Sequence, residues 1–149
     1  GILATIIIPQ VSVSTDDAKL NTLKTNLGNM RGAVELYYYQ HNNKYPGQQK
    51  ADGSGVAGSA DAPDAFLYQL TRYTSVTGAT AASKDDTTYK YGPYIKNGIP
   101  DNPFNDKNTV ACDTGTNDIT AKTSDGNEGY KFYVQTGVLM ADDGANDSL

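Results

Sequence analysis

The feature that most constrains this chain is a stripe of apolar residues that recurs every three or four positions in its first third. The members of the stripe are Leu20, Leu23, Leu27, Met30, Val34 and Tyr37. Steps of three and four place side chains on one face of an α-helix. We therefore predict one long helix, from Ile2 to about Asn43, whose apolar face must be covered by another part of the fold.

The predicted helix holds two glycines and ends in three tyrosines. Gly28 and Gly32 each lower the helix propensity by about 1 kcal/mol relative to Ala. We expect that they gain stability from packing or that they allow a close approach. Successive helical residues diverge by about 100°, so of the three tyrosines only Tyr37 continues the stripe. Tyr38 and Tyr39 are expected to meet the head, a neighbouring subunit or water.

The chain opens with an almost unbroken apolar run from Gly1 to Ile8, which is closed by Pro9. The run lacks the basic start and the small-residue cleavage site of a signal peptide. It is also shorter than the roughly 20 apolar residues that span a bilayer. We expect the run to be the last part of a longer apolar segment, with Pro9 kinking or loosening the helix.

Short elements joined by polar loops are predicted for the rest of the chain. The segments 47–62 and 74–88 are rich in small and polar residues and predict loops. Between them, Asp64 is expected to cap a short helix over 65–73. The residues of this helix that are expected to face inward are Phe66, Leu67 and Leu70. Strands are predicted at 89–95, 109–112, 130–135 and 137–140, and the last two are expected to form a hairpin.

These elements predict an α+β fold in which a long N-terminal helix packs on a small antiparallel β-sheet. The helix is assigned to residues 1–43, and a globular head with a loop, a short helix and the sheet is assigned to residues 44–149. One domain is the natural count for 149 residues. The sheet is the available cover for the apolar stripe of the helix.

The charge of the chain argues against nucleic acid as a partner. The formal net charge is -5, and the Lys and Arg residues form no cluster. Counterion release from phosphates, which drives nucleic-acid binding, therefore has no basic surface on which to act.

Motifs of catalysis are missing from the sequence, and we predict that the protein is not an enzyme. His41 is the only His, so no zinc-binding pair is available, and its place at the helix end favours an interaction with the helix dipole. Cys112 has no His near it and is expected to be a small buried residue, with an intermolecular bridge or a modification as the alternative. Residues 53–58 match GxGxxG, but their flanks lack the strand and helix of a dinucleotide site, so a loop is expected.

Oxygen-bearing side chains gather in a glycine-containing turn near residue 149. They are Asp142, Asp143, Asn146 and Asp147. Ca²⁺ prefers several such oxygens around a flexible loop, although the spacing does not match an EF-hand. A second acidic loop, residues 101–106, is available to approach this turn. We predict a Ca²⁺ site here, and the alternative is a solvated tail that forms turns.

Four stretches, taken in order, resemble the superfamily of type IV pilins and major pseudopilins of type II secretion. GILATIIIPQ resembles the end of the hydrophobic N-terminal segment of that superfamily, including its proline, and AKLNTLKTNLGNMRGAVELYYYQHNNKYPG is similar to its helix and helix exit. GPYIKNGIPDNPFND resembles the loop of pseudopilin-like heads, and YKFYVQTGVLMADDGAND resembles their final hairpin and acidic tail. The resemblance covers nearly the whole chain.

The resemblance implies a subunit that waits in the inner membrane and is then assembled, by machinery of that membrane, into a helical filament in the periplasm or outside the cell. Such a filament is a homo-oligomer with the apolar helices bundled at its centre. The residues assigned to this assembly helix are Ile2, Leu3, Ile6, Ile7, Ile8, Pro9, Leu20, Leu23 and Leu27. We expect them to divide between contacts to other subunits and contacts to the sheet.

Two departures from the superfamily's pattern affect this interpretation. The first part of the apolar segment, with its processing site, is not in the sequence. The paired cysteines of many pilins are also missing, since Cys112 is the only Cys. The second departure favours a pseudopilin-like head, whose last loop is often held by Ca²⁺. The alternative function is that of a minor pilin or of a surface-exposed binding or adhesive module.

Overall fold

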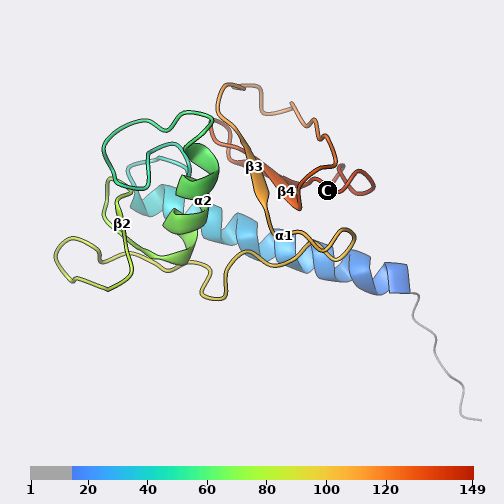
Figure 1. The fold of residues 1–149 in the computed structure, drawn as a ribbon, viewed down its shortest axis with the longest axis horizontal. Coiled ribbons are helices and arrows are strands. Elements are labelled where there is room, and N and C mark those ends of the chain that lie inside the picture. Colours follow the sequence, from blue (N-terminus) through green and yellow to red (C-terminus); the bar gives the residue numbers. More distant parts are fainter. Residues whose placement is uncertain (1–14) are drawn as a thin grey trace, which may run out of the picture.

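The computed structural model describes residues 15–149. Six of the predicted assembly residues lie outside the described residues: Ile2, Leu3, Ile6, Ile7, Ile8 and Pro9. The elements, in chain order, are α1 (Thr15–Gln40), α2 (Ala62–Thr71), β1 (Tyr73–Thr74), β2 (Thr80–Ala81), β3 (Val110–Asp113), β4 (Tyr130–Tyr133) and β5 (Val138–Ala141). They form the predicted α+β fold, in which α2 and the three-stranded sheet lie along one side of the long helix α1 (Figure 1). Within residues 15–149, no helix is long and apolar enough to cross a membrane.

Helix α1 confirms the long helix that the apolar stripe predicts. Asp16 and Asp17 lie in its first turn, where the partial positive charge of the helix N-terminus stabilises carboxylates. Leu20 is only half buried. The buried residues of the helix follow the predicted spacing and are Leu23, Leu27, Met30, Ala33, Val34 and Tyr37. The helix ends at Gln40, where Asn42 and Asn43 adopt left-handed backbone angles, with φ of 54° and 58°. Asn tolerates this conformation better than most residues, which suits it to a helix end.

The three-stranded sheet has the order β3–β4–β5 and is mixed rather than wholly antiparallel. Strands β4 and β5 form the predicted antiparallel hairpin, with Phe132 paired to Leu139. Strand β3 runs parallel to β4, with Cys112 paired to Phe132. A parallel pair needs a connection of about a dozen residues or more, and residues 114–129 provide it.

The predicted strand at 89–95 is wrong. Within 89–95, only Tyr91 forms a β-bridge: its backbone N–H donates to the carbonyl of Thr74, and the N–H of Thr74 donates to the Tyr91 carbonyl at 2.9 Å. The next residues end the pairing, because Gly92 has a φ of 78° and Pro93 has no N–H to donate. Thr74 belongs instead to β1, which pairs with β2 in a two-residue ladder that the sequence patterns did not predict.

Helix α2 begins three residues earlier and ends two residues earlier than predicted. Asp64 is not its cap, because it lies within the first turn, and Asp61 occupies the N-cap position without a side-chain capping bond. Proline in the first turn fixes a backbone angle that suits a helix start. Phe66 and Leu70 are fully buried as predicted, but Leu67 is 37% exposed and does not face the core.

The core lies where the inner face of α1 meets α2 and the β4–β5 hairpin. Phe66 of α2 packs against Phe132 of β4, with ring centroids 4.7 Å apart. Arg31 joins α1 to β5, because its Nε and Nη2 donate to the carbonyl oxygen of Leu139 at 3.1 and 2.7 Å. Nη2 also donates to the carbonyl oxygen of Leu149. The head is therefore fixed to one face of the helix by both apolar and polar contacts.

Buried Gln69 of α2 holds the polar loops together. Its Oε1 accepts from the backbone N–H of Gly47 at 2.8 Å. Its Nε2 donates to the carbonyl oxygens of Gln49 and Gly78, each at 3.0 Å. Burial of an amide is favourable only when its donors and acceptors are paired, and this one pairs two loops that are distant in sequence.

Candidate functional site

The two faces of α1 differ sharply in exposure. This difference shows which of the predicted assembly leucines pack inside the head. Leu23 and Leu27 are 0% and 1% exposed and pack in the hydrophobic core. Their side chains are therefore used by the head and are not available to a second subunit. Leu20 lies nearer the helix start and is half buried.

The outward face of α1 carries exposed apolar side chains. Leu36 is 51% exposed and Tyr39 is 74% exposed. Gly32 and Gly28 lie four and eight residues before Leu36, which places them on the same side of the helix. We call these four residues, Gly28, Gly32, Leu36 and Tyr39, the outer face. Large exposed apolar side chains gathered on one surface are typical of an interaction site.

Within residues 15–149, the two glycines of the outer face have no packing role. A Cβ atom built on Gly28 or on Gly32 finds no atom within 4 Å, apart from the backbone of the same helix turns. Alanine would therefore fit at both positions and would favour the helix by about 1 kcal/mol at each. Packing within residues 15–149 therefore does not explain why glycine, rather than alanine, occupies either position.

The acidic turn near residue 149 is ordered by its own carboxylates. Asp143 Oδ1 accepts from the backbone N–H groups of Ala145 and Asn146 at 2.9 and 2.8 Å, and Asp147 Oδ1 accepts from Gly144 at 3.0 Å. Asn102, from the second acidic loop, donates its side-chain N–H to Asp143 Oδ2 at 2.8 Å. Burial alone would raise the pKa of Asp143, but these hydrogen bonds outweigh it, and the pKa is lowered.

Asp142 differs from the other carboxylates because it is completely buried. Its Oδ1 accepts from the hydroxyl of Ser124 and from the backbone N–H groups of Asp125 and Gly126, at 3.1 and 2.9 Å for the two amides. Its Oδ2 is buried and has no hydrogen-bond partner. A buried carboxylate oxygen without a partner is costly unless a cation or water meets it.

The fit of these residues to Ca²⁺ is partial. The unpartnered Oδ2 of Asp142 is the kind of oxygen that Ca²⁺ binds. In the part of the chain that the structure describes, however, no three acidic, His or Cys side chains are grouped so that they could hold a metal ion. Asp143, Asn146 and Asp147 are instead engaged in the turn itself. The Ca²⁺ site remains a prediction, and Asp142 is the residue on which it rests.

His41 directly follows the last residue of α1 and lies in a buried and fully bonded position. It is 1% exposed, and its ring stacks on that of Tyr37 with centroids 3.7 Å apart. Nδ1 lies 2.8 Å from the carbonyl oxygen of Tyr37, which can only accept, so Nδ1 carries the proton. Nε2, 2.7 Å from the Thr74 hydroxyl, accepts from it. Burial lowers the pKa of His41, and backbone hydrogen bonds only partly offset this.

The other singled-out residues show no catalytic arrangement. Cys112 is half buried in β3, and burial raises the pKa of its thiol to about 12, so the thiol is neutral and unreactive near pH 7. The GxGxxG stretch forms a turn in which the N–H of Gly53 donates to Lys50, and Gln49 bridges to Val56. No strand precedes this turn and no helix opens within it, so the geometry of a dinucleotide site is missing there.

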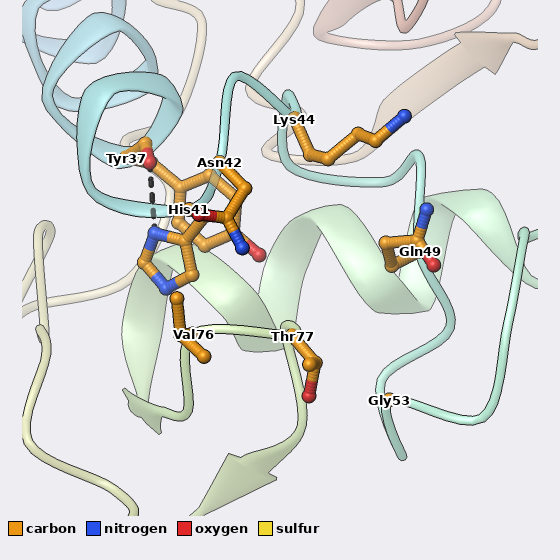
Figure 2. A pocket seen from close by; sticks show the side chains of 8 residues that line it. All are labelled: Tyr37, His41, Asn42, Lys44, Gln49, Gly53, Val76 and Thr77. Carbon is orange, nitrogen blue, oxygen red and sulfur yellow. Dashed lines mark hydrogen bonds between the residues drawn. The ribbon is translucent and has the colours of Figure 1, made fainter.

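A pocket of about 230 Å³ lies beyond the last turn of α1, and sequence reasoning missed it. Its walls come from the helix end, the segment that follows it, the 53–58 motif and the turn after β1 (Figure 2). The lining residues are Tyr37, His41, Asn42, Lys44, Gln49, Gly53, Val76 and Thr77. Because the walls belong to segments that are separate in sequence, no local motif could have indicated the pocket.

No family model, curated protein or solved structure matches this chain. Its function is therefore argued from the surface of α1, the acidic turn and the pocket.

Proposed function

We propose that this protein is a structural subunit of a helical filament of the type IV pilus or pseudopilus kind, assembled through its N-terminal helix. The observation that carries the proposal is the division of α1 into an inner face buried by the head and an exposed outer face. A long helix that served only its own head would have no need for exposed Leu36 and Tyr39 beside two glycines without packing partners.

The composition of the outer face suits contact with another helix. Glycines four residues apart lower the helix surface, so a neighbouring helix can approach the backbone closely. Leu36 and Tyr39 add apolar area next to this low surface. The helix propensity that each glycine loses, about 1 kcal/mol, would then be offset by contacts between subunits.

The sequence before α1 supports the same assignment. Residues 2–8 are apolar except for Thr5, and a more polar segment before Thr15 joins them to the first turn of the helix. In the proposed filament this apolar segment lies at the centre, after release from the inner membrane by the assembly machinery. The head, with its acidic and polar loops, faces water in the periplasm or outside the cell.

The test is a comparison of two charge insertions in the full-length subunit. Leu36→Glu places a carboxylate on the outer face, and we expect filaments to disappear from sheared cells while the subunit still folds. Val56→Glu is the matched control, because Val56 is 72% exposed and lies on a loop rather than on α1, and it should leave filaments intact. Normal filaments from Leu36→Glu cells would contradict the proposal.

A further inference from the structure

We propose that the pocket beyond the last turn of α1 binds a small uncharged ring that carries several hydroxyl groups, such as one sugar unit. The inference goes beyond the filament role and does not depend on it. It rests on a tyrosine hydroxyl that faces the pocket, on walls that keep the pocket open, and on the chemistry of the lining side chains.

The first support is the hydroxyl of Tyr37. The residue is 1% exposed, and its ring is fixed by stacking on His41 and by an edge contact with Tyr94. The hydroxyl points toward the space between Asn42, Gln49 and Thr77 (Figure 2). Burial, with a smaller effect of Tyr94, raises the pKa of Tyr37, so the group remains a donor at neutral pH. A hydroxyl donor that faces the pocket can give a hydrogen bond to an acceptor there.

The second support is that the walls are held apart by the fold. Gly78 has a φ of 89°, and a Cβ atom there would lie 2.8 Å from Gln69 Nε2 and 3.0 Å from the Tyr37 hydroxyl. Glycine at this position therefore keeps a side chain away from the Tyr37 hydroxyl. Gln69 bonds the carbonyl groups of both Gly78 and Gln49, so two walls are tied to one buried side chain. The pocket is thus preformed, as ligand sites usually are.

The third support is the mixture of polar groups in the walls. Asn42 and Gln49 present amides that both donate and accept, and Thr77 presents a hydroxyl that does the same. Hydroxyl groups of a sugar also donate and accept, so they match such walls. The only charged lining residue is Lys44. A cation would meet no carboxylate, and an anion would meet the negative end of the α1 dipole.

The size of the pocket and its apolar area also suit one sugar ring. The volume of about 230 Å³ lies below the roughly 300–1,000 Å³ of pockets for drug-sized molecules, so one ring is the appropriate size. Val76 is 39% exposed and lines one side, where it can contact the C–H groups of a ring. Because the site is small, we expect affinities in the millimolar range.

The test is a titration of the isotope-labelled full chain with glucose and with galactose, followed by NMR. We expect saturable shifts of the backbone amides of Gln49, Gly53 and Thr77 with at least one sugar. Tyr37→Phe keeps the aromatic stack and removes only the hydroxyl, and it should weaken binding about tenfold. Tyr39→Phe, on the exposed outer face, is the control and should change nothing.

Three results would overturn the proposal. Absence of shifts with either sugar would mean that the pocket holds only water. Tighter binding of glucuronate, lost in Lys44→Gln, would mean that the site takes an anion. Sugar binding that survives Tyr37→Phe would place the sugar elsewhere. Thr77→Ala on the opposite wall gives a second variant if Tyr37→Phe fails to fold, and it too should weaken binding.

Discussion

The inner and outer faces of α1 belong to one helix, yet their side chains differ in exposure and in the contacts they make. On the inner face, Leu27 and Met30 are 1% exposed and contribute to the core. On the outer face, Leu36 and Tyr39 are 51% and 74% exposed, and a Cβ atom added to either glycine beside them would meet no other segment of residues 15–149. We therefore expect that mutations can change the stability of the head and the contact with other subunits independently. The predictions that follow test this independence.

The largest expected effect is on the inner face. Leu27→Ala should lower the free energy of unfolding by about 3 kcal/mol, because it removes buried apolar area and leaves a cavity. Leu36→Ala, the matched change on the outer face, should alter it by less than about 0.5 kcal/mol. Denaturant unfolding of both variants measures this. Equal losses would show that the two faces are not distinct.

The acidic turn gives the next prediction, because it belongs to the head rather than to α1. If Ca²⁺ meets Asp142 Oδ2, a chelator should lower the melting temperature, by an amount equivalent to about 2–3 kcal/mol at Ca²⁺ well above its dissociation constant. Asp142→Asn should remove this sensitivity, and so should Asp143→Ala. Asp86→Asn, a carboxylate far along the sequence from the turn, is the control. A melting curve that a chelator leaves unchanged would exclude the Ca²⁺ site.

A smaller effect, dependent on pH, is expected at the end of the inner face. The pKa of His41 is lower in the folded chain than the value of about 6.5 expected when unfolded. The unfolded state therefore binds more protons, and stability should fall as the pH drops below about 6.5. Asp143, whose pKa is also lowered, contributes only at more acidic pH, as the pH falls below its unfolded value of about 3.9.

Denaturant unfolding at a series of pH values measures the His41 effect. In His41→Gln the loss of stability between about pH 6.5 and 5 should be reduced. Retention of the full loss in this variant would assign the pH dependence to other groups.

Regular patterns in the sequence predicted the parts of the fold that depend on local spacing. The three-and-four spacing from Leu23 to Tyr37 predicted the inner face, and two strand-forming runs within residues 130–140, separated by a short turn, predicted the hairpin. The segment 89–95 misled because its aromatic residues favour a strand, whereas Gly92 and Pro93 end the pairing at Tyr91.

Contacts between segments distant in sequence were not predictable. His41 is buried because it meets Thr74, which lies 33 residues away. The pocket depends on Gln69 and Gly78 to hold its walls, and no local pattern connects them to Tyr37. The exposed outer face was not predictable either. The sequence alone does not distinguish Leu36 from a leucine of the core, because the difference depends on which face of the helix the head covers.

Gly32→Ala asks whether the outer face of α1 is kept open for another helix. We expect two opposite changes. The free energy of unfolding of the isolated chain should rise by up to about 1 kcal/mol, since nothing within 4 Å obstructs the new Cβ. The concentration of subunit needed for filament assembly should also rise, whereas Gly58→Ala, which has open space on a loop, should leave assembly unchanged. Assembly of Gly32→Ala at the wild-type concentration would contradict the account.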